Sequence, residues 1–203
     1  MIEIRNLSTG YYKDSSLLQN FNYIFEENKI YGILGESGIG KTTLLRTISG
    51  LMKPLSGEVI INGKKVKKVS SDVYMMHQNY TCFDWKNCLE NILITKSIKQ
   101  RISNQDIEDA KEMLKLVSLD GCEQKYPKQL SGGMRQRLAL ARTLFMKPSI
   151  LLMDEPLSAL DEDTRKRMQN LILDFHKENG CTIIMVTHSS EEANYMCDKL
   201  LKL

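Results

Sequence analysis

The sequence lacks the features that would place it in a membrane, outside a cell or among disordered chains. No apolar run approaches the roughly 18 residues that a bilayer-spanning helix needs, and the opening residues MIEIRNLS are too polar for a secretion signal. Five cysteines are an odd number without a CxxC pair, which argues against a disulfide framework or a zinc site. Neither charge sign dominates, since 28 basic and 25 acidic residues leave +3. We expect a globular, intracellular chain.

What the 203 residues do contain is an alternation of strand and helix signals. Short apolar segments predict strands at 2–7, 21–25, 29–34, 59–61, 150–153 and 182–186. Apolar residues from Leu44 to Leu51 predict a helix that Gly50 and Pro54 close, and helical spacing dominates from about 88 to 147. This order predicts a parallel-sheet core interrupted by a helical subdomain.

A glycine-rich segment follows the predicted strand at 29–34. Residues 35–43 read GESGIGKTT, which matches the G-x-x-x-x-G-K-[ST] pattern of phosphate-binding loops between a strand and a helix. Glycines let backbone amides turn toward phosphate oxygens, and the helix directs the positive end of its dipole there. We expect Lys41 to reach the β- and γ-phosphates and the Thr42 hydroxyl to coordinate Mg²⁺. The predicted nucleotide-binding residues of this loop are Gly35, Glu36, Ser37, Gly38, Ile39, Gly40, Lys41, Thr42 and Thr43.

Two adjacent carboxylates end the apolar strand at 150–153. The sequence ILLMDEP places Asp154 and Glu155 after four apolar residues, and Pro156 ends the strand. Acids rarely follow a buried parallel strand unless a cation or a water needs them there. Asp154 suits an indirect hold on Mg²⁺, and Glu155 suits polarising the water that attacks the γ-phosphate. The alternative, a solvated strand end, is less favoured beside a phosphate loop.

A second anion-binding surface is predicted far along the chain from the first. In LSGGMRQR, Ser131 is a suitable N-cap, and Gly132 and Gly133 let an anion approach the first amides of the following helix. One chain with one triphosphate does not need two such surfaces. A head-to-tail pair of chains does, because each surface would close on the nucleotide of the partner chain.

These motifs, in this order, resemble those of the ATP-binding-cassette (ABC) ATPases over nearly the whole chain. GESGIGKTT resembles their phosphate loop, LSGGMRQR their signature motif, ILLMDEP their acidic strand, and SALD at 158–161 the loop between paired sites. The resemblance implies an α/β fold: a P-loop NTPase core with a mostly parallel sheet, an N-terminal antiparallel β subdomain and an inserted α-helical subdomain. It implies a single domain over 1–203, with a nucleotide-binding core of about 1–78 and 150–203 and a helical subdomain of about 79–149.

The resemblance also implies roles that spacing alone does not. Gln78, in MMHQN, is similar to a glutamine that links Mg²⁺ and the attacking water to the helical subdomain. His188 resembles the switch histidine, which is expected to contact the γ-phosphate. An aromatic residue ahead of the second strand stacks on adenine in this family; Tyr11 fits that role best, and Tyr12 is the alternative. The implied cofactors are ATP and Mg²⁺, with metal contacts from Thr42, Gln78 and Asp154 and catalytic roles for Lys41, Gln78, Glu155 and His188.

The function that the resemblance implies is ATP hydrolysis by a dimer, with itself or a homologous ABC chain, that powers a membrane transporter. Because the chain has no span of its own, we expect it on the cytoplasmic face of the cell membrane, docked to a transmembrane permease subunit near Gln78–Trp85. Phe83 and Trp85 are candidate docking groups, although packing onto the helical subdomain is an equal alternative. The stretch 83–92 also resembles a segment in importers of nitrate, sulfonates and related small compounds.

Two alternatives stay open. A non-transport ABC ATPase would regulate a membrane complex or act on DNA or the ribosome, although DNA-acting relatives usually carry a long coiled-coil insertion and translation-type relatives two cassettes. The lysines of the run Lys64–Lys68 could bind nucleic acid or anionic lipid, but no aromatic residues interleave with them, which favours a solvated hairpin. We therefore expect no nucleic-acid partner.

Overall fold

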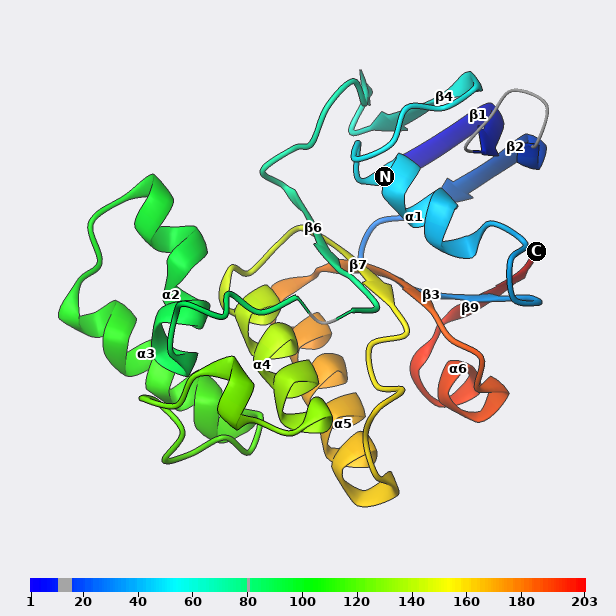
Figure 1. The fold of residues 1–203 in the computed structure, drawn as a ribbon. Coiled ribbons are helices and arrows are strands. Elements are labelled where there is room, and N and C mark those ends of the chain that lie inside the picture. Colours follow the sequence, from blue (N-terminus) through cyan, green and yellow to red (C-terminus); the bar gives the residue numbers. More distant parts are fainter. Residues whose placement is uncertain (11–15, 80) are drawn as a thin grey trace. The chain divides into compact units, whose positions relative to one another are not determined.

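The computed structural model describes residues 1–10, 16–79 and 81–203, and its elements are drawn in Figure 1. These residues form two compact units, each described by itself. The first unit comprises Met1–Met75, Ser149–Glu155 and His176–Leu203, and the second comprises Met76–Pro148 and Pro156–Phe175. No helix among the described residues combines the length and the apolar character needed to cross a bilayer.

Two sheets build the first unit. Their strands are β1 (Ile2–Gly10), β2 (Ser16–Phe25), β3 (Ile30–Leu34), β4 (Ser56–Ile61), β5 (Lys64–Lys65), β6 (Val73–Met76), β7 (Ile150–Asp154), β8 (Thr182–Val186) and β9 (Lys199–Lys202). One sheet is antiparallel with the order β2-β1-β4-β5, and the other has the order β6-β7-β8-β3-β9. In the second sheet β7, β8, β3 and β9 pair in parallel. The predicted α/β class, with a mostly parallel core and an antiparallel N-terminal sheet, is confirmed.

The core of the first unit lies around the parallel sheet. Every residue of β7 and of β8 is buried, which explains their unbroken apolar sequences. Helix α1 (Lys41–Ile48) buries Leu44, Leu45 and Ile48 completely. The prediction for Leu51 was wrong: Gly50 leaves the helix with φ +79°, so Leu51 lies outside α1 and is 52% exposed.

The turn between β4 and β5 follows from its sequence. Asn62 and Gly63 have φ values of 49° and 75°, the left-handed conformations that an Asn-Gly hairpin turn requires. Val66 N–H then donates to the Val59 carbonyl, which continues the pairing past the short β5. The predicted hairpin at this position is therefore confirmed.

Helices build the second unit. They are α2 (Cys88–Lys99), α3 (Asn104–Leu116), the 3-10 helix η1 (Pro127–Gln129), α4 (Gly132–Phe145) and most of α5 (Glu162–Asn179), while α6 (Ser190–Met196) belongs to the first unit. Asn87 and Ser103 begin α2 and α3 with capping boxes. Helix α2 packs against both α3 and α4. The helical spacing of Ile107, Ala110, Leu114 and Val117 predicts one buried face; the last three are fully buried, and Ile107 is partly buried.

Candidate functional site

The first part of the candidate site lies at the carboxyl edge of the parallel sheet. β3 and β8 pair with Ile33 opposite Val186, and β7 and β8 pair with Asp154 opposite Val186. Beyond these pairs, Glu155 N–H donates to the Val186 carbonyl at 3.0 Å, and Thr187 N–H donates to the Ile33 carbonyl at 3.4 Å. The segments that follow β3, β7 and β8 therefore leave the sheet side by side at its carboxyl edge, which is where open α/β sheets bind their ligands.

The phosphate loop leaves this edge after β3. Gly38 and Gly40 have φ values of 83° and 109°, a conformation that side chains with a Cβ rarely adopt. Gly40 is the N-cap of α1 and provides no side-chain hydrogen bond to the first amides of the helix. No acidic residue lies in the first turn. The positive end of the α1 dipole is thus available to an anion. Gly35, Glu36, Ser37 and Ile39 complete the loop, and Lys41, Thr42 and Thr43 open the helix.

Lys41 is the cation of this loop. Its side chain is only 6% exposed, and Nζ donates to the carbonyl oxygens of Gly35 at 2.7 Å and Glu36 at 2.8 Å. Both acceptors are neutral carbonyl oxygens, so a phosphate that displaced one of them would form a charge-assisted hydrogen bond in its place. The loop folds back onto the side chain that the sequence predicts as its phosphate contact.

Glu155 and His188 are in direct contact at the same edge. His188 Nε2 lies 2.7 Å from Glu155 Oε1, and the Glu155 side chain is 18% exposed. Glu155 adopts φ +51°, which costs a residue with a Cβ roughly 1–2 kcal/mol. Strain of this kind persists where the surrounding structure over-determines a residue, and it gathers at functional sites. The fold therefore brings into direct contact two predicted catalytic residues that lie 33 positions apart in the sequence.

Asp154 and Thr42 are the candidate oxygen ligands from this edge of the sheet. Asp154 ends β7 and is 1% exposed, and α1, which carries Thr42 at its second position, packs against β7. A hydroxyl and a carboxylate are hard oxygen ligands, the kind that Mg²⁺ takes together with substrate phosphates. This donor set fits a nucleotide-bound magnesium ion. Tyr11 and its alternative Tyr12 lie outside the described residues.

The second unit carries the signature segment at the start of α4. Ser131 is the N-cap, and its Oγ accepts a hydrogen bond from Met134 N–H at 3.2 Å. Ser131 and Gly132 are exposed, and a Cβ on Gly132 would meet nothing within 4 Å. A Cβ on Gly133 would approach the Ala159 carbonyl to 3.2 Å, so that glycine permits close packing against the SALD segment. The start of α4 is exposed, and anion binding at this position stays a prediction.

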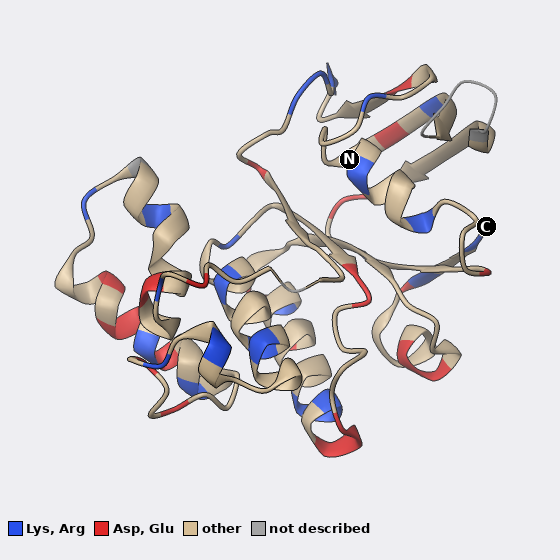
Figure 2. Ribbon diagram, viewed as in Figure 1, with Lys and Arg blue, Asp and Glu red and all other residues tan. Residues whose placement is uncertain are grey.

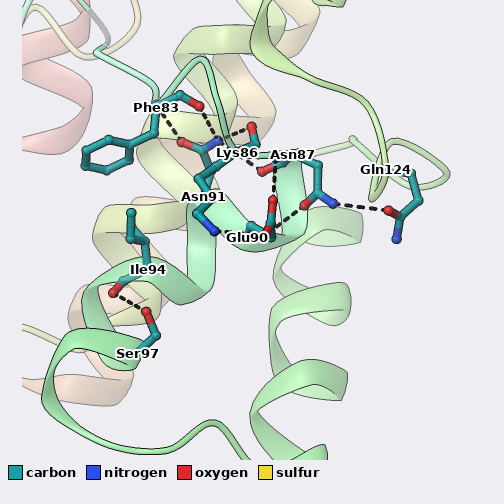
Figure 3. Close-up of polar contacts among 8 residues, drawn as sticks. All are labelled: Phe83, Lys86, Asn87, Glu90, Asn91, Ile94, Ser97 and Gln124. Atoms are coloured by element: carbon teal, nitrogen blue, oxygen red, sulfur yellow. Dashed lines mark hydrogen bonds and ion pairs between the residues drawn. The ribbon is translucent and has the colours of Figure 1, made fainter.

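The segment after Gln78 is fastened by one buried amide. Gln78 is exposed, and five residues later the chain reaches Phe83, whose N–H donates to Asn91 Oδ1 at 2.8 Å. Asn91 Nδ2 donates to the carbonyls of Phe83, Lys86 and Asn87 at 3.1, 2.8 and 3.0 Å. Figure 3 shows the Asn91 side chain reaching from α2 into this loop. Because Asn91 is completely buried, water cannot reach its side-chain amide, and these hydrogen bonds satisfy the polar atoms of the amide instead.

Two aromatic rings are displayed by the fastened loop. Phe83 and Trp85 stack edge to face with ring centroids 5.4 Å apart, and Trp85 is 71% exposed. The Arg142 guanidinium lies 5.1 Å from the Phe83 ring and donates to the Thr81 carbonyl at 2.6 Å. Burial lowers the pKa of Arg142. Phe83 packs onto α4 through Arg142, in line with the packing alternative, whereas the docking role of the exposed Trp85 stays a prediction.

Sequence reasoning missed the positioning roles of Asn91, Arg137, Arg142 and Gln136. Arg137 Nη1 donates to the Val117 and Ser118 carbonyls, and Gln136 Oε1 accepts from Ala159 N–H at 3.1 Å. The one available signal was polar residues inside an otherwise apolar helical pattern, since Asn91 and Gln136 are both fully buried.

Comparison with known proteins finds similarity over the whole chain. A family model described as ABC transporter matches residues 18–158. An ABC transporter ATP-binding protein of Methanocaldococcus jannaschii is 45% identical over 186 residues, which span 92% of this chain and 70% of that protein. The aliphatic sulfonates import ATP-binding protein SsuB of Bacillus anthracis is 36% identical over 203 residues, 98% of this chain and 80% of that protein.

A solved structure matches as well. The post-hydrolysis dimer of the ATP-binding cassette MJ0796, bound to ADP and Pi, superimposes with a TM-score of 0.90 at 30% sequence identity, covering 100% of this chain and 94% of that chain. The same fold thus occurs in a nucleotide-bound dimer of a similar protein.

Proposed function

The chain belongs to the ABC transporter ATP-binding family, and we propose that it binds and hydrolyses ATP to power a membrane transporter that imports a small molecule. The observation that carries the proposal is the gathering of the GESGIGKTT loop, Asp154, Glu155 and His188 at one edge of a parallel sheet. Import of a small molecule is supported by the similarity to an ATP-binding protein named for aliphatic sulfonate import.

Binding of ATP would use the loop amides, the start of α1 and Lys41. The phosphates would take over the Lys41 Nζ hydrogen bonds that the Gly35 and Glu36 carbonyls accept. Charge-assisted bonds to phosphate are roughly twice as strong as neutral ones, so this exchange favours the nucleotide. Preorganised donors aimed at the γ-phosphate then stabilise the charge of the transition state.

Thr42 and Asp154 are the residues of this edge that would hold Mg²⁺, with Gln78 as the third proposed contact. When bound, the ion neutralises charge on the β- and γ-phosphates. Asp154, buried at the end of β7, would act on the ion from the sheet side, and Thr42 from the start of α1.

Hydrolysis would depend on Glu155 and His188. Glu155 would orient the attacking water and accept its proton, as a carboxylate held at the sheet edge by its backbone bond to Val186 can do. His188 would hold the Glu155 carboxylate through the 2.7 Å contact and turn to the γ-phosphate when ATP is present. Its side chain is 46% exposed, which leaves room for that movement.

The complete site would need two chains. Ser131, Gly132 and Gly133 of one chain would close on the γ-phosphate held by the loop of the other, in a head-to-tail dimer with a second copy or a homologous ABC chain. The exposed start of α4 supports this arrangement. Removal of the γ-phosphate would then take away the group that bridges the two chains, and the dimer would open.

A transmembrane permease subunit is the proposed partner, docked near Gln78–Trp85 on the cytoplasmic side of the membrane. The exposed Trp85 ring is the proposed contact, because large aromatic side chains commonly contribute most to interfaces. Asn91 and Arg142 keep the backbone beneath that ring in place.

An ATPase assay with matched glutamates tests the enzyme proposal. Glu155→Gln should bind ATP, accumulate as a dimer and hydrolyse ATP about 10²–10⁴-fold more slowly than the parent chain. The control, Glu178→Gln, changes an exposed glutamate on α5 and should leave the rate unchanged. Parent-like turnover by Glu155→Gln would exclude the proposed role of Glu155.

Affinity purification from gently solubilised native membranes tests the transport proposal. A multi-span membrane protein recovered in near-equal amount would support the coupling role, and Trp85→Ala should reduce that recovery. Recovery with ribosomes, DNA or no partner would exclude the transporter proposal while leaving ATP hydrolysis standing.

A further inference from the structure

Positive charge is concentrated in one short segment of the first unit. Residues 50–70 contain five lysines and one glutamate, so the segment carries a larger net charge than the +3 of the whole chain. Four of the lysines lie on and just after β5, where the ribbon in Figure 2 is blue over most of its length. The excess positive charge of this chain therefore sits on one hairpin and the loop that precedes it.

A cavity opens inside this basic region. Its volume is about 390 Å³, within the range of roughly 300–1,000 Å³ that small-ligand sites occupy. We call it the hairpin pocket. It is lined by the residues Gly50, Met52, Lys53, Pro54, Gly57, Glu58, Lys65, Val66 and Lys67.

The charges of the hairpin pocket do not balance. Lys65 Nζ pairs with Glu58 Oε2 at 2.9 Å, which accounts for the one acidic side chain of the lining. Lys53 and Lys67 are exposed lining residues and add two further positive charges around the same cavity. An anion bound there would face three ammonium groups and one carboxylate.

Apolar side chains accompany these lysines. Met52, Pro54 and Val66 line the hairpin pocket, and Leu51 and Val69, next to it in the chain, are 52% and 53% exposed. The backbones of the two loops meet, because a Cβ on Gly50 would lie 2.6 Å from the Lys68 carbonyl oxygen. Leu51 and Val69 thus flank a point of contact between the lysine-bearing segments.

From this arrangement we propose that the hairpin pocket binds the phosphate headgroup of an anionic phospholipid at a membrane surface. The lysines attract the headgroup phosphate, and Leu51 and Val69 enter the boundary between headgroups and acyl chains. Basic charge combined with exposed apolar side chains is the composition that binds membrane interfaces. A free phosphate or a nucleic-acid backbone would use the lysines and leave the two apolar side chains in water.

Vesicle sedimentation with the full chain tests the proposal. The chain should sediment with phosphatidylcholine vesicles that contain phosphatidylglycerol and stay in solution with phosphatidylcholine alone. The variant Lys53→Gln/Lys65→Gln/Lys67→Gln should bind about 100-fold more weakly, since each lysine near an anionic surface contributes about fivefold. Leu51→Ser, which keeps every charge, should weaken binding about tenfold.

A charge-matched control separates this pocket from general attraction by net charge. Lys125→Gln/Lys166→Gln/Lys177→Gln removes three exposed lysines elsewhere and should retain most of the vesicle binding. Both triple variants should keep the ATPase rate of the parent chain, because none of these residues is part of the proposed ATP site. Their melting temperatures should stay close to that of the parent chain, since the Lys65–Glu58 pair is partly exposed and contributes little to stability. The outcome of this experiment is thus independent of whether the chain powers a transporter.

Three results would overturn the proposal. Equal loss of binding in the two triple variants would show diffuse attraction without a defined site. Binding of pyrophosphate or duplex DNA through these lysines, with no binding to vesicles, would assign the pocket to a soluble anion or to nucleic acid. Unchanged binding by Leu51→Ser would remove the membrane contact that distinguishes a lipid from those ligands.

Discussion

The two units hold their candidate functional segments by different means. In the first unit the strand register does so, because Glu155 and Thr187 bond through their backbones to neighbouring strands. In the second unit side chains do so: Asn91 fastens the loop before α2, and Arg137 fastens the end of α3. Backbone pairing depends little on which side chain is present, whereas a loop held by side-chain hydrogen bonds depends on the identity of those side chains. We therefore expect the first unit to be sensitive to added atoms near its backbone and the second to lost side-chain groups.

The largest expected effect comes from combining one change in each unit. Lys41→Ala in the first unit and Ser131→Ala in the second should each reduce ATP hydrolysis by about 10²–10³-fold, the cost of removing one phosphate donor. In a head-to-tail dimer of the two variants, one site would carry both changes and the other none. Mixing the two inactive chains should therefore restore about a quarter of the parent activity, measured as phosphate release.

Each variant assayed alone is the control for this experiment and should stay inactive. Loss of the Ser131 cap costs α4 only about 1 kcal/mol, so both variants should remain folded. If the mixture were as inactive as its components, the two units would not complete each other's sites across a dimer, and the proposed division of roles would fail.

The second prediction concerns the backbone of the first unit. Gly57 and Gly63 have nearly the same φ, 73° and 75°. A Cβ on Gly57 would lie 2.2 Å from the Asn6 carbonyl oxygen in β1, whereas one on Gly63 would meet nothing within 4 Å. Gly57→Ala should lower the free energy of unfolding by about 3 kcal/mol, and Gly63→Ala by about 1 kcal/mol, in urea titrations. Equal losses would mean that conformation, and not the approach of β1, governs both positions.

The third prediction concerns the amide of the second unit. Asn91→Ala should lower the free energy of unfolding by about 2 kcal/mol, because it removes the side-chain partner of the part-buried Phe83 N–H and Lys86 carbonyl. Trp85, the only tryptophan in the sequence, reports on the same loop, and its fluorescence anisotropy should fall. Asn91→Asp should not rescue either property, since a carboxylate would face three carbonyl oxygens. Unchanged anisotropy in both variants would show that Asn91 does not hold the loop.

This contrast explains what the sequence could and could not predict. The strands Ile150–Asp154 and Thr182–Val186 were predictable because burial on both faces imposes continuous apolar runs. The edge strands β6 and β9 were missed, since each is four residues long, only the two end residues of β6 are buried, and no residue of β9 is buried. Their strand conformation comes from pairing with β7 and β3, which local sequence does not encode.

The candidate site divides in the same way. The phosphate loop and the acids after β7 were predictable because their chemistry requires particular residues at fixed spacing. To predict the contact between Glu155 and His188, one would have to know the register of β7 against β8. To predict the role of Asn91, one would have to know the path of the loop at Phe83, eight residues before it. Tertiary placement of this kind has no signature within a short window of sequence.

The smallest expected effect tests whether an ion pair contributes to the side-chain network of the second unit. Asp106 in α3 accepts hydrogen bonds from Lys96 in α2 and from Ser103, and the Lys96 bond, followed by the Ser103 bonds, lowers the pKa of Asp106 from 3.8 to about 2. Because the folded state holds this carboxylate ionised, its stabilisation is fully present above about pH 4 and is lost as the pH falls toward 2. Asp106→Asn should melt below the parent chain at pH 7, and the difference should shrink over that window. A difference that persisted unchanged at pH 2 would assign the loss to helix capping by Asp106, and the comparison between the units would then rest on Asn91 and the arginines alone.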